Sequence, residues 1–346
     1  MDIITQGLIG ATFAQSFSNK KSIKIATVAG FLGGLAADSD GFIRSSKDSL
    51  LSIEYHRHFT HSILFIPFGA LIVSLIIWLF LRRKEDFKQV YLFAFLGYAT
   101  HGILDACTSY GTRLFWPFSN ERIAWDNVAI IDPFFTIPLL IAMIWGLKTK
   151  NTLAVRGVFA VCVVYLYLGI IQRNRAIETI QNFAQSNGQV PMKVQAKPTI
   201  GQLVLWKTIY VTENNKAELF YNVNAVRLGI PFLFDTKIYP GETAPVLDSR
   251  KHFADLNPQS TLYKDIFRFE DFSSGMVILM ADNPNVIGDV RYSLLPNQIK
   301  PLWGISIDIT KPDEHANFLG FRAIGERDWT TYWSMIVGTH PAQVSL

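Results

Sequence analysis

The stretch Ser62–Leu81, SILFIPFGALIVSLIIWLFL, decides the fold class of this chain. It contains no charged residue and is followed directly by Arg82, Arg83 and Lys84. Because an α-helix rises about 1.5 Å per residue, a run of about 20 apolar residues crosses the ~30 Å hydrocarbon core of a bilayer. The stretch therefore predicts a membrane-spanning helix that ends at a basic loop.

Five further apolar segments accompany this span in the first half of the chain. Asn127–Leu147 is comparable in length, and its one charged group before the basic end, Asp132, lies close to its start. The other four are Ile3–Asn19, Ile25–Ala37, Gln89–Leu104 and Gly157–Gln172. The first two are marginal alone and need neighbouring helices. The N-terminal residues lack a basic region and a cleavage pattern, so we expect a retained helix and a domain of about six membrane helices.

The composition indicates a membrane domain followed by a soluble one. Hydrophobic residues make up 49% of the 346 residues and charged residues only 17%, which excludes an ordinary cytosolic enzyme. After about Gln172 the mixture becomes that of a soluble domain. We predict a membrane domain at 1–175 and an extracytoplasmic β-rich domain at 176–346. The net charge of +4 is too small to predict nucleic-acid binding, and the two cysteines predict no disulfide framework.

Lys and Arg residues divide unevenly between the two sets of loops. The loops near residues 20–24, 82–88 and 148–156 hold ten of them, whereas those at 38–60 and 106–126 hold five. The positive-inside rule places the richer set in the cytoplasm. The poorer loops, the N-terminus and everything after the sixth helix are then expected on the extracytoplasmic side of the cell (inner) membrane.

Acidic and histidine residues gather at the predicted outer ends of these helices. Ionisable groups in nearly uncharged helices carry a desolvation cost, so they indicate a functional site. His101 and Asp105 are four residues apart and project from one helical face, where both can reach one ion. The candidate metal ligands are Asp38, Asp40, His56, His61, His101, Asp105, Asp126 and Asp132.

Imidazole and carboxylate groups are the ligands of catalytic Zn²⁺, and mixed His/Asp sets also suit Mn²⁺. The candidate set exceeds the usual three protein ligands of one zinc ion. Either two ions bind, or some carboxylates only orient the imidazoles. A lone Asp at a helix start is more often an N-cap, and that interpretation stays open for Asp40, Asp126 and Asp132.

Five sequence motifs in the first 150 residues resemble those of one known family. They are MDIITQGLIG at the start, Asp38-Ser39-Asp40, His56-Arg57-His58-Phe59-Thr60-His61-Ser62, His101-Gly102-Ile103-Leu104-Asp105 with Tyr110-Gly111-Thr112 and Trp116-Pro117-Phe118-Ser119 after it, and Trp125-Asp126 before Ile131-Asp132-Pro133. Their order and spacing resemble the membrane-bound metal-dependent hydrolase family of YdjM and YbcI, also called DUF457. Two departures are Ala37, where the family often has Pro, and Gln6, where some members have His.

The resemblance implies a metal-dependent hydrolase with these Asp and His residues as ligands and catalytic groups. Asp105 or Asp132 would be the general base, and Arg57 would stabilise developing charge or meet lipid phosphates. We expect an ester or phosphoester substrate, including one carried by a membrane lipid, since the helices open at the head-group level. The alternatives are a metal-binding membrane protein without activity and, less favoured, a transporter, whose site would normally lie near the midplane.

The second half of the chain is predicted to form a small β-sheet or sandwich. Gly201–Thr212 and Ala217–Leu228 flank a polar turn and predict a hairpin. Further strands are expected at Met276–Met280, Val290–Leu295 and Trp303–Ile309, and a helical or irregular stretch at Ser249–Phe267. His252 and His315 are interpreted as surface residues, and no catalytic motif appears in this half.

Overall fold

The computed structural model describes residues 1–346 except 82–84, 230–233, 324, 342–343 and 346. The chain divides into two compact units. The first contains Met1–Ile43, Tyr55–Ile171 and Ile200–Gln202, and the second contains Arg44–Glu54, Gln172–Thr199 and Leu203–Leu346. The short segment 44–54 therefore belongs to the second unit, although it lies between two parts of the first.

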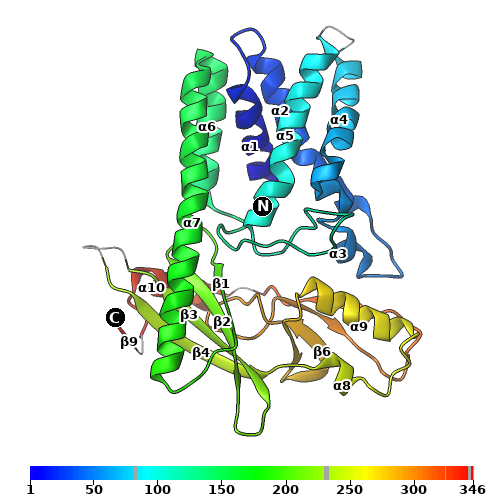
Figure 1. Cartoon of the computed structure of the whole chain (residues 1–346), viewed down its shortest axis with the longest axis vertical. Coiled ribbons are helices and arrows are strands. Elements are labelled where there is room, and N and C mark those ends of the chain that lie inside the picture. Colours follow the sequence, from blue (N-terminus) through cyan, green and yellow to red (C-terminus); the bar gives the residue numbers. More distant parts are fainter. Residues whose placement is uncertain (82–84, 230–233, 324, 342–343, 346) are drawn as a thin grey trace. The chain divides into compact units, whose positions relative to one another are not determined.

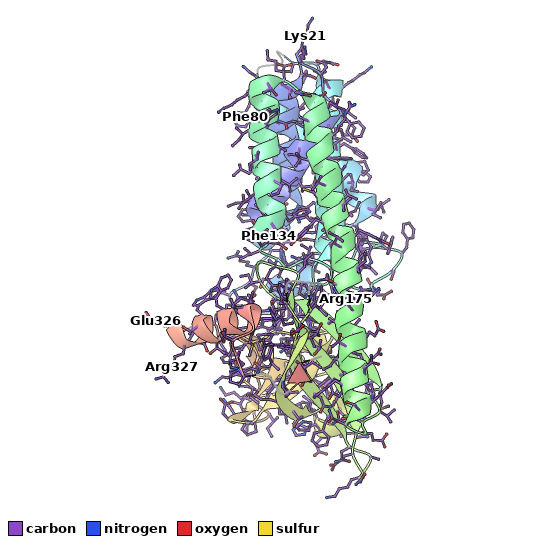
Figure 2. The ribbon with its side chains drawn as sticks, turned by 90° about the vertical axis from the view of Figure 1, so that its left-hand side faces the viewer. Lys21, Phe80, Phe134, Arg175, Glu326 and Arg327 are labelled. Carbon is purple, nitrogen blue, oxygen red and sulfur yellow. The ribbon has the colours of Figure 1, made fainter. Side chains whose placement is uncertain are left out.

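The first unit is a helical bundle (Figure 1). Its main helices are α1 (Ile3–Ser16), α2 (Ile23–Ala36), α4 (Ile66–Phe80), α5 (Phe87–Cys107), α6 (Pro133–Thr149) and the first part of α7 (Thr152–Ser186). The connections α1–α2 and α6–α7 lie at one end of the bundle. Lys21 and Phe80 lie toward that end in Figure 2, and Phe134 lies toward the other. The chain thus alternates between the two ends, as a multi-pass membrane domain does.

Three helices in the described part of the chain are long and apolar enough to cross a membrane. They comprise Ile63–Phe80, Phe87–Cys107 and Thr152–Ser186, and Pro133–Thr149 is a shorter apolar helix. The helices α1 and α2 have 14 residues each, which is about 21 Å and less than the ~30 Å of hydrocarbon. Six predicted segments are helical, but only three of them meet the length of a full span.

Two predicted helix boundaries were wrong. The fifth helix begins at Pro133 and not at Asn127, because Asp132 adopts extended backbone and its carboxylate accepts the Phe134 N–H as an N-cap. Pro133 suits the first helical position, where no N–H partner is needed. The sixth helix, α7, has 35 residues and extends well beyond the predicted Gly157–Gln172 on both sides.

Glycines allow α1, α2 and α5 to pack closely. A Cβ atom at Gly10 would collide with the carbonyl oxygen of Gly30, and one at Gly97 would collide with the same oxygen. Small residues at such contacts let helix backbones approach each other in a membrane protein. The three helices therefore form the tight centre of the bundle, on which the polar residues of the candidate site are arranged.

The second unit contains two antiparallel sheets (Figure 1). The first sheet has the strand order β1-β2-β3-β4-β9 and the second the order β5-β6-β7-β8. The first comprises β1 (Lys193–Pro198), β2 (Leu205–Glu213), β3 (Leu219–Arg227), β4 (Lys237–Pro245) and β9 (Val344–Ser345), and the second β5 (Val277–Met280), β6 (Asn283–Asp289), β7 (Trp303–Ser306) and β8 (Asn317–Gly320). The helices are α8 (Ser249–His252), α9 (Thr261–Phe272) and α10 (Glu326–Val337). The predicted fold class, membrane helices followed by a β-rich domain, is confirmed.

The predicted hairpin is confirmed, because Leu205 to Glu213 pair with Arg227 to Leu219 in antiparallel register. The predicted strand Val290–Leu295 is wrong, since those residues form a turn and bends with a single isolated bridge at Ser293, and the strand is Asn283–Asp289 instead. That strand contains Asn, Pro and Gly, which are typical of turns and hid it in the sequence. Val290 is nevertheless buried in a core that also contains Ile209 and Ile278, so both sheets contribute to one interior.

Candidate metal centre

Four side chains from three segments of the first unit bring imidazole nitrogens and carboxylate oxygens together. His101 and Asp105 lie one turn apart on the same face of α5. Asp38 comes from η1 (Ala37–Phe42), the 3-10 turn after α2, and His61 from η2 (Phe59–His61), which precedes α4. One ligand atom from each lies within 4.8 Å of the other three. We call these four residues the His/Asp cluster.

The spacing of the His/Asp cluster is that of a coordination shell. The Nε2 atom of His61 lies 3.0 Å from Nε2 of His101 and 3.2 Å from Oδ2 of Asp105. Asp38 Oδ1 lies 3.5 Å from His61 Nε2 and 3.4 Å from His101 Nε2, and the remaining His101–Asp105 distance is 3.6 Å. A tetrahedral zinc ion with bonds of about 2.0–2.1 Å holds its ligand atoms about 3.3 Å apart. The cluster therefore fits such an ion.

The outer nitrogen of each imidazole is already engaged. His61 Nδ1 lies 3.0 Å from the Thr60 hydroxyl and 3.1 Å from a carboxylate oxygen of Asp40. His101 Nδ1 lies 2.5 Å from the carbonyl oxygen of Gly34. A neutral imidazole carries one N–H, so these acceptors favour a proton on Nδ1 and a lone pair on Nε2. Two such lone pairs face each other across 3.0 Å, an arrangement that a cation between them would stabilise.

The electrostatic environment favours positive charge at this point. Burial opposes a charged His61, but its hydrogen bonds with the carboxylates of Asp105, Asp38 and Asp40 outweigh burial and raise its pKa to about 10. Burial also opposes ionisation of Asp38, yet hydrogen bonds from His101 and His61 hold the pKa of that carboxyl well below its usual range. The cluster therefore attracts a proton or a metal cation.

Asp40 organises the residues around the cluster. Its Oδ2 accepts the Arg57 backbone N–H at 3.0 Å and the Thr60 hydroxyl at 2.8 Å, and it lies 3.1 Å from His61 Nδ1. Its Oδ1 lies 3.0 Å from His56 Nδ1. A carboxylate behind a ligating imidazole fixes the ring and raises its basicity. Asp40 is thus placed to orient His61, one of the roles that the sequence left open for it.

Asp38, Asp40 and His56 form a second group whose ligand atoms lie within 4.8 Å of one another. His56 is the accessible member, with 44% of its side chain exposed, whereas the Asp40 side chain is fully buried. Asp38 belongs to both groups and is 23% exposed. The accessible side of the site therefore carries Asp38 and His56, and the closed side carries His61 and His101.

Arg57 and Gln6 bind the far oxygen of Asp105. Arg57 Nη2 lies 3.2 Å from Asp105 Oδ1, Gln6 Nε2 donates to the same oxygen at 2.9 Å, and the Met1 amino group also contacts it. Arg57 further donates to the Thr108 hydroxyl at 2.8 Å and has a φ of +62°, which few non-glycine residues adopt. Asp105 thus has Oδ1 occupied by donors and Oδ2 facing the imidazoles. Arg57 is buried in this network, which argues against its contact with lipid phosphates.

Gly102 permits the close approach of η2 to α5. A Cβ atom at this position would collide with the carbonyl oxygen of His61. Tyr98, one turn earlier on α5, donates its hydroxyl to the Thr60 carbonyl oxygen at 2.9 Å. These contacts hold the His61 ring against His101, so α5 both supplies two cluster residues and positions a third.

The structure does not bring Asp126 and Asp132 into either group of the described residues. Asp132 is the N-cap of α6 and also accepts the Tyr165 hydroxyl at 2.8 Å. Its burial raises the pKa of the carboxyl above its usual value. Asp126 lies in the loop before α6 with a φ of +49°. The capping interpretation therefore describes the contacts of Asp132.

Several residues of the site were not identified from the sequence. Thr60 links Asp40 to His61, and the Gly34 carbonyl binds His101. A main-chain oxygen leaves no signal in the sequence. Gln6, noted in the sequence only as a departure from the family pattern, did carry a signal, because an amide is unusual in an apolar helix and requires a polar partner.

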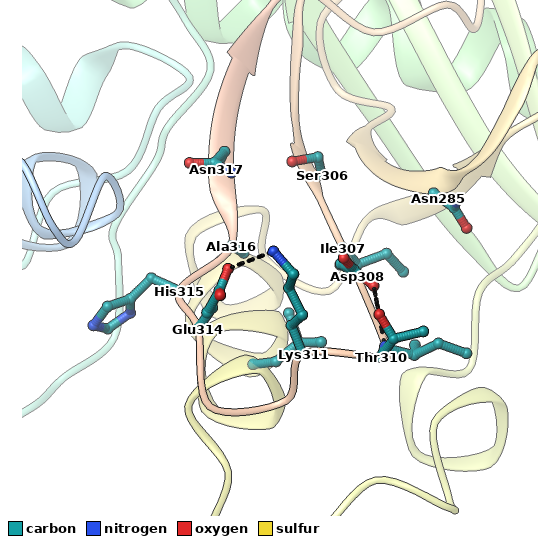
Figure 3. Close-up of a pocket in the computed structure, with 12 residues that line it drawn as sticks. Asn285, Ser306, Ile307, Asp308, Thr310, Lys311, Glu314, His315, Ala316 and Asn317 are labelled. Atoms are coloured by element: carbon teal, nitrogen blue, oxygen red, sulfur yellow. Dashed lines mark hydrogen bonds and ion pairs between the residues drawn. The ribbon is translucent and has the colours of Figure 1, made fainter.

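A cavity of ≈ 540 Å³ also lies in the second unit, around residues 306–317 (Figure 3). Its charged residues are already paired. Lys311 Nζ lies 3.4 Å from Glu314 Oε2, and Asp308 accepts the Thr310 hydroxyl at 2.6 Å. The His315 ring points away from these pairs in Figure 3. We therefore look for chemistry in the His/Asp cluster and not in this cavity.

The bundle and its cluster define a helical membrane protein with a candidate metal centre. The chain belongs to the YdjM inner membrane protein family, which it matches over residues 1–176. It is also 30% identical over 155 residues to the uncharacterized protein YfhP of Bacillus subtilis (strain 168). That match covers 44% of this chain and 46% of the relative, so the chain spans less than half of the relative's length. No solved structure matches the chain significantly. The family match includes every residue of the His/Asp cluster.

Proposed function

We propose that this chain is a metal-dependent hydrolase whose site lies at the end of a helical membrane bundle. One observation carries the proposal: the Nε2 atoms of His61 and His101 face each other at 3.0 Å, beside oxygens of Asp38 and Asp105. Zn²⁺ is the first choice because of the tetrahedral spacing and the His/Asp ligands, and Mn²⁺ is the alternative. One ion would occupy the His/Asp cluster.

A bound metal would lower the pKa of a water molecule toward ~7 and polarise the scissile ester or phosphoester. The residues of the chain would hold the metal ligands in place and accept the proton of that water. Arg57 and Gln6 hold one oxygen of Asp105, which fits an anchoring carboxylate better than a general base. Asp132 is committed to a helix cap.

His56 is the better placed general base. Its Nδ1 lies 3.0 Å from Asp40 Oδ1, and its ring is accessible beside Asp38. A carboxylate that orients an imidazole through Nδ1 leaves Nε2 to take a proton, as in other acid–base sites. The alternative role for His56 is as a ligand of a second ion with Asp38 and Asp40, which Asp38 would bridge.

We further propose that the site faces the extracytoplasmic side. Two of the three loops predicted to be richest in Lys and Arg, α1–α2 and α6–α7, lie at the bundle end that contains Lys21, and the elements that carry the cluster residues lie toward the other end. A site at that depth is reachable from the lipid head groups, which supports an ester or phosphoester of a lipid as the substrate class. The same position at one bundle end disfavours a transporter, whose site is expected near the midplane.

The second candidate function is a metal-binding membrane protein without catalysis. The observation in its favour is that four protein ligands would close a tetrahedral shell, as in structural zinc sites, whereas catalytic sites keep one position open. The side chains of His61 and His101 are fully buried. Catalysis then requires the partly exposed Asp38 to give way to a reactant.

The test combines metal analysis with turnover. The full-length protein is purified, its zinc and manganese are measured, and hydrolysis is followed over a panel of phosphomonoesters, phosphodiesters, carboxylic esters and lipid esters. We expect metal in the wild type, loss of it in His61→Ala and His101→Ala, and normal content in His252→Ala, whose histidine lies in the second unit.

His56→Ala separates the remaining alternatives. A general base predicts unchanged metal content with turnover lost, whereas a ligand of a second ion predicts that the stoichiometry falls from two to one. A folded protein whose His61→Ala and His101→Ala forms keep their metal would refute the site. Metal without turnover in the wild type would favour the second candidate.

A further inference from the structure

Segment 44–54 is held in the second unit by contacts with one arginine and by hydrogen bonds of Ser49. Arg268, on α9, binds Asp48 through Nη1 at 3.2 Å and Nη2 at 3.0 Å. It also binds Glu54 Oε2 through Nε at 2.8 Å and Nη2 at 2.6 Å. The fork-like geometry of a guanidinium allows it to bind two carboxylates at once. Arg268 thereby binds two carboxylates of this segment, which lie 220 and 214 residues before it in the sequence.

A third carboxylate completes this arrangement. Asp265 Oδ1 accepts Arg268 Nη1 at 2.7 Å, and its Oδ2 lies 2.8 Å from His315 Nδ1 and accepts the Ala316 N–H at 3.0 Å. Asp48, Asp265 and His315 also have the spacing of a metal set, and Arg268 supplies one positive charge beside their two carboxylates. His315, expected at the surface, is therefore half-buried in an ion-pair network.

The network is largely withdrawn from solvent, so its contacts are strong. Of the side chains, 22% of Arg268, 17% of Asp48, 1% of Asp265 and 38% of Glu54 are exposed, so Glu54 is the most accessible of the four. Breaking a partly buried pair leaves an uncompensated charge, which destabilises the local structure. Ser49 adds two bonds, as its hydroxyl donates to the Ala316 carbonyl at 2.9 Å and accepts the Phe318 N–H at 2.9 Å.

The two ends of this segment lead directly into the candidate metal centre. Asp40, which orients His61, precedes Arg44 in the chain, and His56 follows Glu54 by two residues. The helix α3 (Leu51–Tyr55) contains Glu54 and ends one residue before His56, so only Tyr55 separates the two residues in the chain. Asp40 and His56 meet at 3.0 Å and so close the loop that contains the segment.

We propose that Arg268 is a positioning residue for the metal centre, because it holds the segment that joins Asp40 to His56. The inference rests on the proposed metal site. It adds that the second unit controls the affinity of that site for its metal ion through segment 44–54, which joins Asp40 to His56. Coupling of this kind is reciprocal. Arg268 must tighten metal binding, and the metal must in turn stabilise the Arg268 network.

The first experiment titrates metal-free, full-length protein with Zn²⁺ against a chromophoric chelator. Coupling between two sites commonly changes affinity by about 5- to 150-fold, and we expect Arg268→Ala to weaken Zn²⁺ binding about 10-fold. Arg268→Lys keeps the charge but not the fork and should recover part of the loss. Arg291→Ala is the matched control, since it breaks the buried Arg291–Asp289 pair in another part of the same unit.

The second experiment measures amide hydrogen exchange of residues 44–54 with and without Zn²⁺. Zinc should slow exchange of this segment in the wild type and have no such effect in Arg268→Ala. If Arg268→Ala fails to fold, Glu54→Gln removes one contact of the network and should show a smaller change in the same direction.

The outcomes separate this inference from the proposed function. If the wild type binds no Zn²⁺ in a manner sensitive to His61→Ala, the metal site is wrong and the inference fails with it. If the wild type binds Zn²⁺ and Arg268→Ala binds it equally well, only the positioning role is refuted. If Arg268→Ala and Arg291→Ala weaken Zn²⁺ binding equally, the effect comes from general destabilisation of the second unit. That outcome would also refute the positioning role of Arg268.

Discussion

The Nε2 atoms of His61 and His101 lie 3.0 Å apart, while the Nδ1 atom of each ring is engaged elsewhere. Neither ring can therefore turn its proton toward the other without losing a hydrogen bond to Asp40 and Thr60 or to Gly34. Such a pair is stable only when something positive is shared between the rings. Substitutions that shift either ring should therefore change what binds between them.

Asp40→Asn should weaken Zn²⁺ binding without abolishing it. The amide keeps one acceptor but loses the charge that supports His61, and partners of this kind contribute on the order of 10- to 100-fold in metal affinity. Chelator competition measures the change, and Asp126→Asn, which lies outside all three metal-type groups of the described residues, is the control. An unchanged affinity in Asp40→Asn would show that this carboxylate does not act on His61.

Gly102→Ala should lower metal affinity while α5 stays helical. The added methyl group would meet the His61 carbonyl oxygen, so η2 must move away and carry the imidazole from His101. The matched control is Gly157→Ala on α7, where nothing lies within 4 Å of the added atom. Circular dichroism checks the helix content and a Zn²⁺ titration checks the site. Equal affinities for the two variants would contradict the close approach described here.

Asp132→Asn should keep both metal content and turnover. Asn caps a helix nearly as well as Asp, because its Oδ1 can accept the Phe134 N–H. Its Nδ2 would then donate to the Tyr165 hydroxyl oxygen, which in the wild type donates to Asp132 Oδ2. Asp132→Ala should instead lower thermal stability, since loss of a cap costs about 1 kcal/mol. Loss of turnover in a folded Asp132→Asn protein would return this carboxylate to the catalytic machinery.

Cysteines introduced at Ser46 and Gln259 should react with a membrane-impermeant maleimide from outside the cytoplasmic membrane. Both positions are exposed, and the native Cys107 and Cys162 are buried, which keeps background labelling low. A cysteine at Lys21 should react only after permeabilisation, because its loop belongs to the basic set. The opposite pattern would invert the proposed orientation.

The stability of the second unit should rise with pH above neutrality. Burial lowers the pKa of Lys207 to about 7, below the ordinary value of 10.5. Between these two values the unfolded chain binds more protons than the folded one, so raising the pH favours folding. Lys207→Met should flatten this dependence, whereas Lys216→Met in an exposed turn should not. The free energy of unfolding, measured at pH 7, 8 and 9, tests this prediction. The same dependence on pH in the wild type and in Lys207→Met would contradict it.

The sequence predicts those features that depend on local pattern. The run Ser62–Leu81 and the His101/Asp105 spacing each identify their structure from neighbouring residues alone. The sequence could not show that Asp105 belongs to the cluster and Asp132 does not, since both lie at helix ends. The difference depends on the direction in which each side chain leaves its helix and on the residues that it contacts. It also could not assign segment 44–54 to the second unit, because that depends on Arg268, 214 residues after Glu54.

The chain order of these residues has a consequence for biogenesis. A ribosome makes Asp38, His61, His101 and Asp105 well before it makes Arg268. Because N-terminal domains usually fold first during synthesis, the four cluster residues can come together in the nascent bundle while the second unit is still untranslated. In the proposed metal site, the ion would then bind during synthesis, before the Arg268 contacts form. The later binding of Arg268 to Asp48 and Glu54 would raise the affinity of the site for that ion.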